Sequence, residues 1–193
     1  MPRMGMGMPL VATAQSSAIN VQDFFFDQLQ GDSNLSPIHT ASRTNSITNS
    51  EDFSSGAGGN LTNISVATNT VIAPNGTQTA DTITPTTTNG IHTRTYSGSS
   101  NSATSVFAKA NGYTKFRINT ASSGNGFASF DLSNGTVATG GTFFSSASIE
   151  EAGNGFFRCS LVVIGGGNTP TIAIENAGGN VSFAGDGTSG IHF

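Results

Sequence analysis

Charged residues are scarce in this chain. They make up 9% of its 193 residues, lysine occurs only at Lys109 and Lys115, and the formal net charge is -4. A surface that binds nucleic acid needs clustered Lys and Arg to neutralise phosphates, and the sequence contains no basic stripe. Nucleic acid is therefore not an expected partner. The low charge also argues against ordinary disorder, which combines low hydrophobicity with high net charge.

Cysteine, tryptophan and long apolar runs are equally poorly represented. Cys159 is the single cysteine, so no disulfide can form within the chain, and tryptophan is absent. No apolar run approaches the roughly 18 residues that a transmembrane helix needs, so no membrane insertion is expected. The N-terminus alternates Met with Gly and lacks the apolar core of a secretory signal. We therefore do not expect export through a cleaved signal peptide.

Residues 1–48 show no regular hydrophobic period, and prolines and glycines interrupt them. One apolar cluster lies within this segment and consists of Phe24, Phe25, Phe26 and Leu29. Three consecutive Phe cannot share one face of a strand, and a helix spreads them over roughly 200°. The cluster therefore needs apolar cover on two sides. We predict that residues 1–48 form an extended, mostly irregular arm that docks through this cluster into another subunit; packing within this chain's own core is the alternative.

Residues 49–193 read as a series of short β-strands. Segments rich in Thr, Val, Ile and aromatic residues occur at 79–84, 91–96, 103–110, 114–120, 155–164 and 171–175. Asn-Gly pairs, which favour the type I′ hairpin turn, occur at 75–76, 89–90, 111–112, 134–135 and 154–155. No stretch shows sustained helical periodicity. We therefore predict an all-β fold, an antiparallel β-sandwich with a jelly-roll path, over residues 49–193.

Six segments of this region carry a more specific signal. They read SEDF (50–53), APNGTQTAD (73–81), VFAKANGYTKFRI (106–118), FDLSNGTV (130–137), SIEEAGNGFFRCS (148–160) and GDGTSGIHF (185–193). In this order they resemble the carbohydrate-binding-module-like jelly-roll domain of bacteriophage tail, fibre and other virion structural proteins. One departure is that Phe156-Phe157 stand where the family pattern has Trp-Tyr. The flat aromatic faces that stack on sugars, Trp foremost, are thereby reduced.

The resemblance implies a non-enzymatic phage virion structural protein. On this interpretation the chain is a tail fibre, spike or fibre-base component whose residues 1–48 contact tail, baseplate or capsid proteins. It also implies a homo-oligomer, with a trimer expected, and a place in the virion after assembly in the host cytoplasm. Two alternatives stay open: a receptor-binding module for host surface glycan, and a capsid decoration or head fibre protein.

Candidate chemical sites are few. A glycosidase needs two carboxylates that face one bond across ~5–9.5 Å, but Glu150 and Glu151 are adjacent and point to opposite faces of a strand. We interpret them as solvated carboxylates at a strand end and expect no enzyme activity. Cys159 lies mid-strand, which predicts a buried and inert thiol. Glycan binding would require a concave face with exposed Tyr96 or Tyr113 and clustered Asn, Asp and Arg.

Metal and modification sites are not expected either. His39, His92 and His192 lack neighbours at ligand spacing, and the single carboxylate Asp186 in GDGTSG indicates a tight turn before the last strand more strongly than a calcium site. No cofactor or metal is predicted. The sequons that begin at Asn60, Asn63, Asn75, Asn134 and Asn180 are interpreted as turn residues.

Overall fold

The structure of the chain is a computed structural model. It describes residue 47 and residues 50–54, 59–96, 103–120, 126–142, 144–164 and 169–193, with Thr120 described for its backbone alone. The predicted docking residues Phe24, Phe25, Phe26 and Leu29 and the boundary at 48/49 lie outside the described residues. None of the described residues forms a helix that could cross a membrane.

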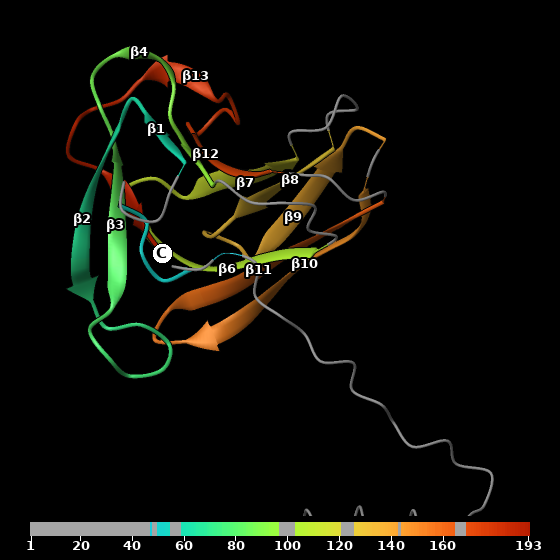
Figure 1. Cartoon of the computed structure of the whole chain (residues 1–193), viewed down its shortest axis with the longest axis horizontal. Helices are drawn as coiled ribbons and strands as arrows, with labels where there is room; N and C mark the ends of the chain where they lie inside the picture. The colour runs from blue at the N-terminus through green and yellow to red at the C-terminus, as the bar shows by residue number, and fades with distance from the viewer. Residues whose placement is uncertain are drawn as a thin grey trace, which may run out of the picture. The chain divides into compact units, whose positions relative to one another are not determined.

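The described part of the chain is built from β-strands (Figure 1). In chain order the strands are β1 (Asn60–Thr62), β2 (Ile64–Val71), β3 (Ala80–Pro85), β4 (Asn89–Ile91), β5 (Thr93–Thr95), β6 (Ala103–Asn111), β7 (Lys115–Thr120), β8 (Phe127–Asp131), β9 (Thr136–Gly140), β10 (Phe144–Gly153), β11 (Phe156–Val163), β12 (Pro170–Glu175), β13 (Ser182–Ala184) and β14 (Gly190–His192).

These strands form two six-stranded sheets and a two-stranded ribbon. Sheet 1 has the order β1-β5-β12-β7-β8-β9, sheet 2 has the order β10-β11-β6-β14-β3-β2, and the ribbon pairs β13 with β4. All these strand pairs are antiparallel. The chain passes repeatedly from one sheet to the other, as from β6 to β7 and from β9 to β10 (Figure 1). The predicted antiparallel β-sandwich is confirmed.

The core lies between the sheets and follows the period of two that a strand imposes. On β7 and β8 the inward positions are Phe116, Ile118, Ala128 and Phe130, all fully buried. Phe116 and Phe130 stack with ring centres 5.2 Å apart. Complete burial of each ring contributes roughly 1.5–3 kcal/mol. Because these residues point inward, their alternate neighbours form the outer face of sheet 1.

Only one of the predicted Asn-Gly turns has the type I′ geometry. Asn154 and Gly155 both have positive φ, 53° and 77°, in the tight turn between β10 and β11. At Asn134-Gly135 only the glycine has positive φ, and its N–H donates to the Asp131 carbonyl in a four-residue turn between β8 and β9. The predicted type I′ turn is therefore confirmed at Asn154-Gly155. At Asn134-Gly135 the chain forms a hairpin, as predicted, but with a different type of turn.

The other three pairs do not form hairpin turns of this type. Asn89-Gly90 begins β4, where Gly90 pairs with Phe183. Asn111-Gly112 marks the passage from sheet 2 to sheet 1, and Gly76 lies inside the longer β2–β3 loop. Gly112 has φ 96°, and a Cβ there would lie 2.4 Å from Cβ of Ser189. The predictions were wrong because a turn type follows from which strands pair, and that pairing is set by distant segments.

Candidate functional site

Three of the segments that carry the family resemblance meet at Asp81. Its carboxylate is buried and accepts the N–H of Phe53 on Oδ2 and the N–H of Asn69 on Oδ1, each at 2.9 Å. The backbone of Asp81 exchanges two hydrogen bonds of 2.8 Å with Phe193. The ring of Phe53 stacks on that of Phe193 with centres 5.2 Å apart. Asp81 therefore joins the SEDF segment, the bulge of β2 and the C-terminal segment.

The aromatic residues expected on a glycan-binding face are not displayed there. Tyr96 is 4% exposed, with the Arg94 guanidinium 4.4 Å from its ring centre. Burial raises the pKa of Tyr96 well above its usual range. Tyr113 is partly buried, and its ring packs against Phe183. Tyr96, one of the two tyrosines that glycan binding would expose, instead closes the core beside Phe53.

The described histidines have structural contacts. His92 is fully buried, with Nδ1 2.7 Å from the carbonyl oxygen of Asn63 and Nε2 2.8 Å from that of Phe183. It thereby ties the β4–β13 ribbon to the sandwich. His192 Nδ1 lies 2.8 Å from the hydroxyl of Thr82, and burial together with the charge of Lys109 lowers the pKa of His192. His39 lies outside the described residues. Among the residues described, no three His, Cys, Asp or Glu side chains are grouped to hold a metal ion.

Cys159 and Asp186 have the predicted surroundings. Cys159 is fully buried in β11, and burial raises the pKa of its thiol to about 12. Asp186 Oδ1 accepts the N–H groups of Thr188 and Ser189 at 2.8 and 2.7 Å. Hydrogen bonds from Ser189 and Thr188 lower the pKa of Asp186 to about 2. The buried thiol and the tight turn before the last strand are both confirmed.

Glu150 and Glu151 are exposed on β10, an edge strand of sheet 2. Glu150 lies opposite Arg158 of β11, and Glu151 lies opposite Phe157. Both carboxylates are solvated, as predicted. Of the sequon residues, Asn63 has φ 51° between β1 and β2, whereas Asn60 lies in β1 and is not a turn residue.

A groove of about 560 Å³ lies on the outer face of sheet 1. Its described lining is Asn60, Thr62, Ile91, Thr93, Thr95, Arg117, Asn119, Gly126, Phe127, Thr171, Ala173 and Val181. Strand register arranges most of the polar residues in two rows across the sheet. The first row is Asn60, Thr95, Thr171, Asn119 and Phe127, and the second is Thr62, Thr93, Ala173, Arg117 and Ser129. Neighbouring strands lie ~4.8 Å apart, so five residues in a row span roughly 19 Å.

Arg117 is the only charged residue among the described lining residues, and its contacts hold it in place. Its Nε donates to Oε1 of Glu175, and its Nη2 donates to the carbonyl of Gly179 at 3.2 Å. The guanidinium lies 4.3 Å from the centre of the Phe127 ring. That ring in turn covers Gly140 of β9, where a Cβ would lie 2.5 Å away from it. Phe127 is therefore packed between Gly140 and Arg117, and its ring does not form an open stacking platform.

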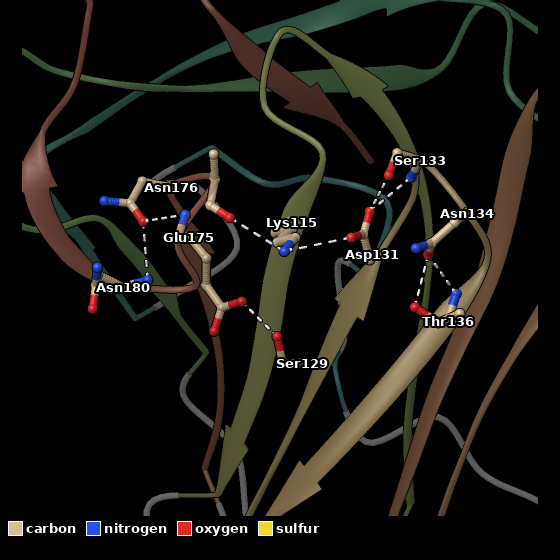
Figure 2. A network of polar contacts seen from close by, with 11 residues as sticks. Lys115, Ser129, Asp131, Ser133, Asn134, Thr136, Glu175, Asn176 and Asn180 are labelled. Atoms are coloured by element: carbon tan, nitrogen blue, oxygen red, sulfur yellow. Dashed lines mark hydrogen bonds and ion pairs between the residues drawn. The ribbon is translucent and has the colours of Figure 1, made fainter.

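A second set of charges continues beside the groove (Figure 2). Glu175 has no exposed side-chain surface, and its Oε2 accepts a hydrogen bond from Ser129. Lys115 lies 3.5 Å from Asp131 and donates to the carbonyl of Ala177. Partial burial raises the pKa of Asp131, but hydrogen bonds from Ser133 and the Lys115 ammonium outweigh burial and leave it below its usual range. The two anions of this face are thus each paired with a cation.

A second hollow of about 330 Å³ lies where the described chain enters the sandwich. It is lined partly by Phe53, Pro74, Val106 and Phe107. Phe107 is 44% exposed, so it contributes an apolar surface at the edge of this hollow. Phe107 was not singled out in the sequence, because an alternating strand pattern does not say which face is covered.

The groove residues were also not singled out. The signal that marks some of them is that Thr95, Arg117 and Asn119 flank the fully buried Arg94 and Ile118 along their strands. That alternation identifies an outer face but not which face of which sheet is hollowed.

No protein-family model matches the chain, and no curated protein matches it significantly.

Proposed function

We propose that this chain is a non-enzymatic structural protein of a bacteriophage particle, in the position of a tail fibre, spike or fibre-base component. The observation that supports this proposal is the convergence at Asp81. The SEDF, APNGTQTAD and GDGTSGIHF segments, which resemble those of phage virion proteins, are the ones that Asp81 and Phe193 hold together. The segments that carry the resemblance are therefore also segments that hold this sandwich together. This is expected if the chain has the same architecture as those virion proteins.

Three of the described carboxylates, Glu150, Glu151 and Glu175, are not arranged as a glycosidase pair. Glu150 and Glu151 are solvated on an edge strand, away from the groove lining. Glu175, beside the groove, has no exposed side-chain surface and is engaged by Arg117 and Ser129. A pair of accessible carboxylates facing one glycosidic bond is therefore not formed by these residues.

A reconstruction of the phage particle tests the structural role. We expect copies of residues 49–193 to project outward around a threefold axis, with residues 1–48 against a neighbouring tail, baseplate or capsid protein. Quantitative mass spectrometry of purified particles provides the stoichiometry. Absence of the chain from purified particles contradicts the structural proposal, and a single copy without symmetry mates contradicts the trimer.

The groove supports a second function, recognition of host surface glycan. Its two rows present hydroxyl, amide and guanidinium groups, which donate to and accept from the hydroxyls of a saccharide. Sites for small polar ligands combine a concave surface with a few convergent polar groups. The roughly 19 Å span of each row suits a short oligosaccharide that runs across the strands. Without an open aromatic platform, hydrogen bonds carry more of this recognition.

Removing two groove hydroxyls tests the glycan-binding function. Thr95 and Thr171 lie side by side with hydroxyls 3.2 Å apart, in the middle of the first row. We expect the double change Thr95→Val and Thr171→Val to weaken glycan binding about tenfold, since each hydrogen bond contributes roughly 0.5–1.5 kcal/mol. Thr68→Val, at an exposed position of β2 in sheet 2, is the matched control and should bind normally.

The measurement is a glycan array followed by titration calorimetry with the best ligand. Unaltered affinity in the groove variant, with the fold intact by circular dichroism, would place any glycan site elsewhere on the molecule.

A further inference from the structure

We infer that the groove on sheet 1 selects neutral saccharides and discriminates against anionic ones. The inference rests on the proposed glycan-binding function and specifies its ligand class. It follows from the single described cation of the lining, Arg117, and from what already surrounds it.

The charge of Arg117 is already neutralised by Glu175, which lies beside the groove. Glu175 contacts Nε directly, and its side chain has no surface exposed to solvent. Ser129 donates to the other carboxylate oxygen and so fixes the orientation of the pair. A ligand anion approaching Arg117 therefore also meets the full negative charge of Glu175 a few ångströms further away. Because the pair is partly shielded from water, that repulsion is screened less than it is at an open surface.

The hydrogen bonds that Arg117 already donates also disfavour an anionic ligand. Strong recognition of a carboxylate by arginine uses two parallel N–H groups on one edge of the guanidinium. On the Nε/Nη2 edge both nitrogens already donate, to Glu175 and to the Gly179 carbonyl. One face of the guanidinium is covered by Phe127. This edge is occupied, so a ligand carboxylate is left with the Nη1/Nη2 edge, whereas single hydrogen bonds to sugar hydroxyls need no such fork.

The charged residues next to Arg117 do not give the groove a net positive charge. Lys115 lies beside the groove, but Asp131 is 3.5 Å from its ammonium, and the Ala177 carbonyl accepts a further hydrogen bond. Arg117, Lys115, Asp131 and Glu175 together sum to zero charge. A sialylated or uronate-containing glycan would therefore be desolvated at the groove without an uncompensated cation to meet it.

The test compares matched ligands with the full-length protein. A glycan array that contains sialylated oligosaccharides and their desialylated counterparts is read at about 50 mM and 500 mM NaCl. We expect neutral members to bind at least about tenfold more tightly than anionic ones, with less than a twofold change between the two salt concentrations, because screening affects binding that depends on net charge. Tighter binding of the anionic member of a pair overturns the inference and leaves glycan binding intact. Absence of binding to any glycan instead rejects the proposed function itself.

A charge change beside the groove gives an independent test. Glu175→Gln keeps the side-chain length and leaves Arg117 with an uncompensated charge. We expect anionic glycans to bind this variant at least about fivefold better than they bind the wild type at low salt, with the gain lost at high salt. Glu150→Gln raises the net charge equally but lies on β10 of sheet 2, away from the groove lining, and should change anionic binding less than twofold.

A folded Glu175→Gln variant that still excludes anionic glycans overturns the role of Glu175. Should thermal denaturation show that this variant does not fold, the wild-type comparison at two salt concentrations still decides the inference.

Discussion

Asp81→Asn is expected to lower the free energy of unfolding of the sandwich by about 3 kcal/mol, since each hydrogen bond to a buried charged group contributes roughly 1.5–3 kcal/mol and an unsatisfied donor costs more. The carboxylate uses both oxygens, one for the N–H of Phe53 and one for that of Asn69. Asparagine has the same shape but only one oxygen. Its NH₂ group must therefore face one of these N–H donors, and Asp81 is 1% exposed, so water cannot compensate.

Asp186→Asn is the matched control. Asp186 also accepts two backbone N–H groups, but both bind the same oxygen, Oδ1, in an exposed turn. Asparagine can accept both in the same way, and solvent screens the loss of charge in this exposed turn, so the denaturation midpoint should fall much less than for Asp81→Asn. Urea denaturation followed by circular dichroism measures both variants. Equal midpoints for the two variants would mean that the Asp81 contacts contribute nothing to the stability of the fold.

The strands were predicted well where inward and outward residues alternate. The segments expected at 103–110, 114–120 and 171–175 correspond to β6, β7 and β12 with ends shifted by one residue. The expected strand at 91–96 divides instead into β4 and β5, because His92 turns inward to reach the carbonyls of Asn63 and Phe183. No local pattern signals that contact, since both partners are distant in sequence.

The candidate site was much harder to predict than the fold. Thr95, Thr171 and Asn119 form one row only because β12 lies between β5 and β7, and that strand order is not encoded in any one segment. The identity of Tyr96 likewise suited a sugar platform, but the ring packs against Phe53, which comes from a distant segment, and under the guanidinium of its near neighbour Arg94. Residue type thus indicated the kinds of groups available, whereas tertiary packing decided which of them reach the surface.

Replacing Phe24, Phe25 and Phe26 with Ser is expected to abolish incorporation into phage particles and to leave the sandwich folded. Burial of three Phe side chains in a partner contributes roughly 5–9 kcal/mol before ordering costs, and Ser removes nearly all of it. Among the described residues the fully buried core lies between Phe53 and Phe193, and Ile47 is the described residue of the 1–48 segment that packs against it.

A second variant changes the same three residues to Leu. It tests whether docking needs apolar side chains in general or aromatic rings in particular. Leu retains most of the apolar surface, so this variant should still incorporate, at reduced occupancy. Mass spectrometry of purified particles measures occupancy, and thermal denaturation measured by circular dichroism reports on the sandwich. Normal occupancy of the Ser variant would show that the arm docks without its Phe cluster. Unfolding of the sandwich in that variant would assign Phe24, Phe25 and Phe26 to the core of this chain and contradict the docking arm.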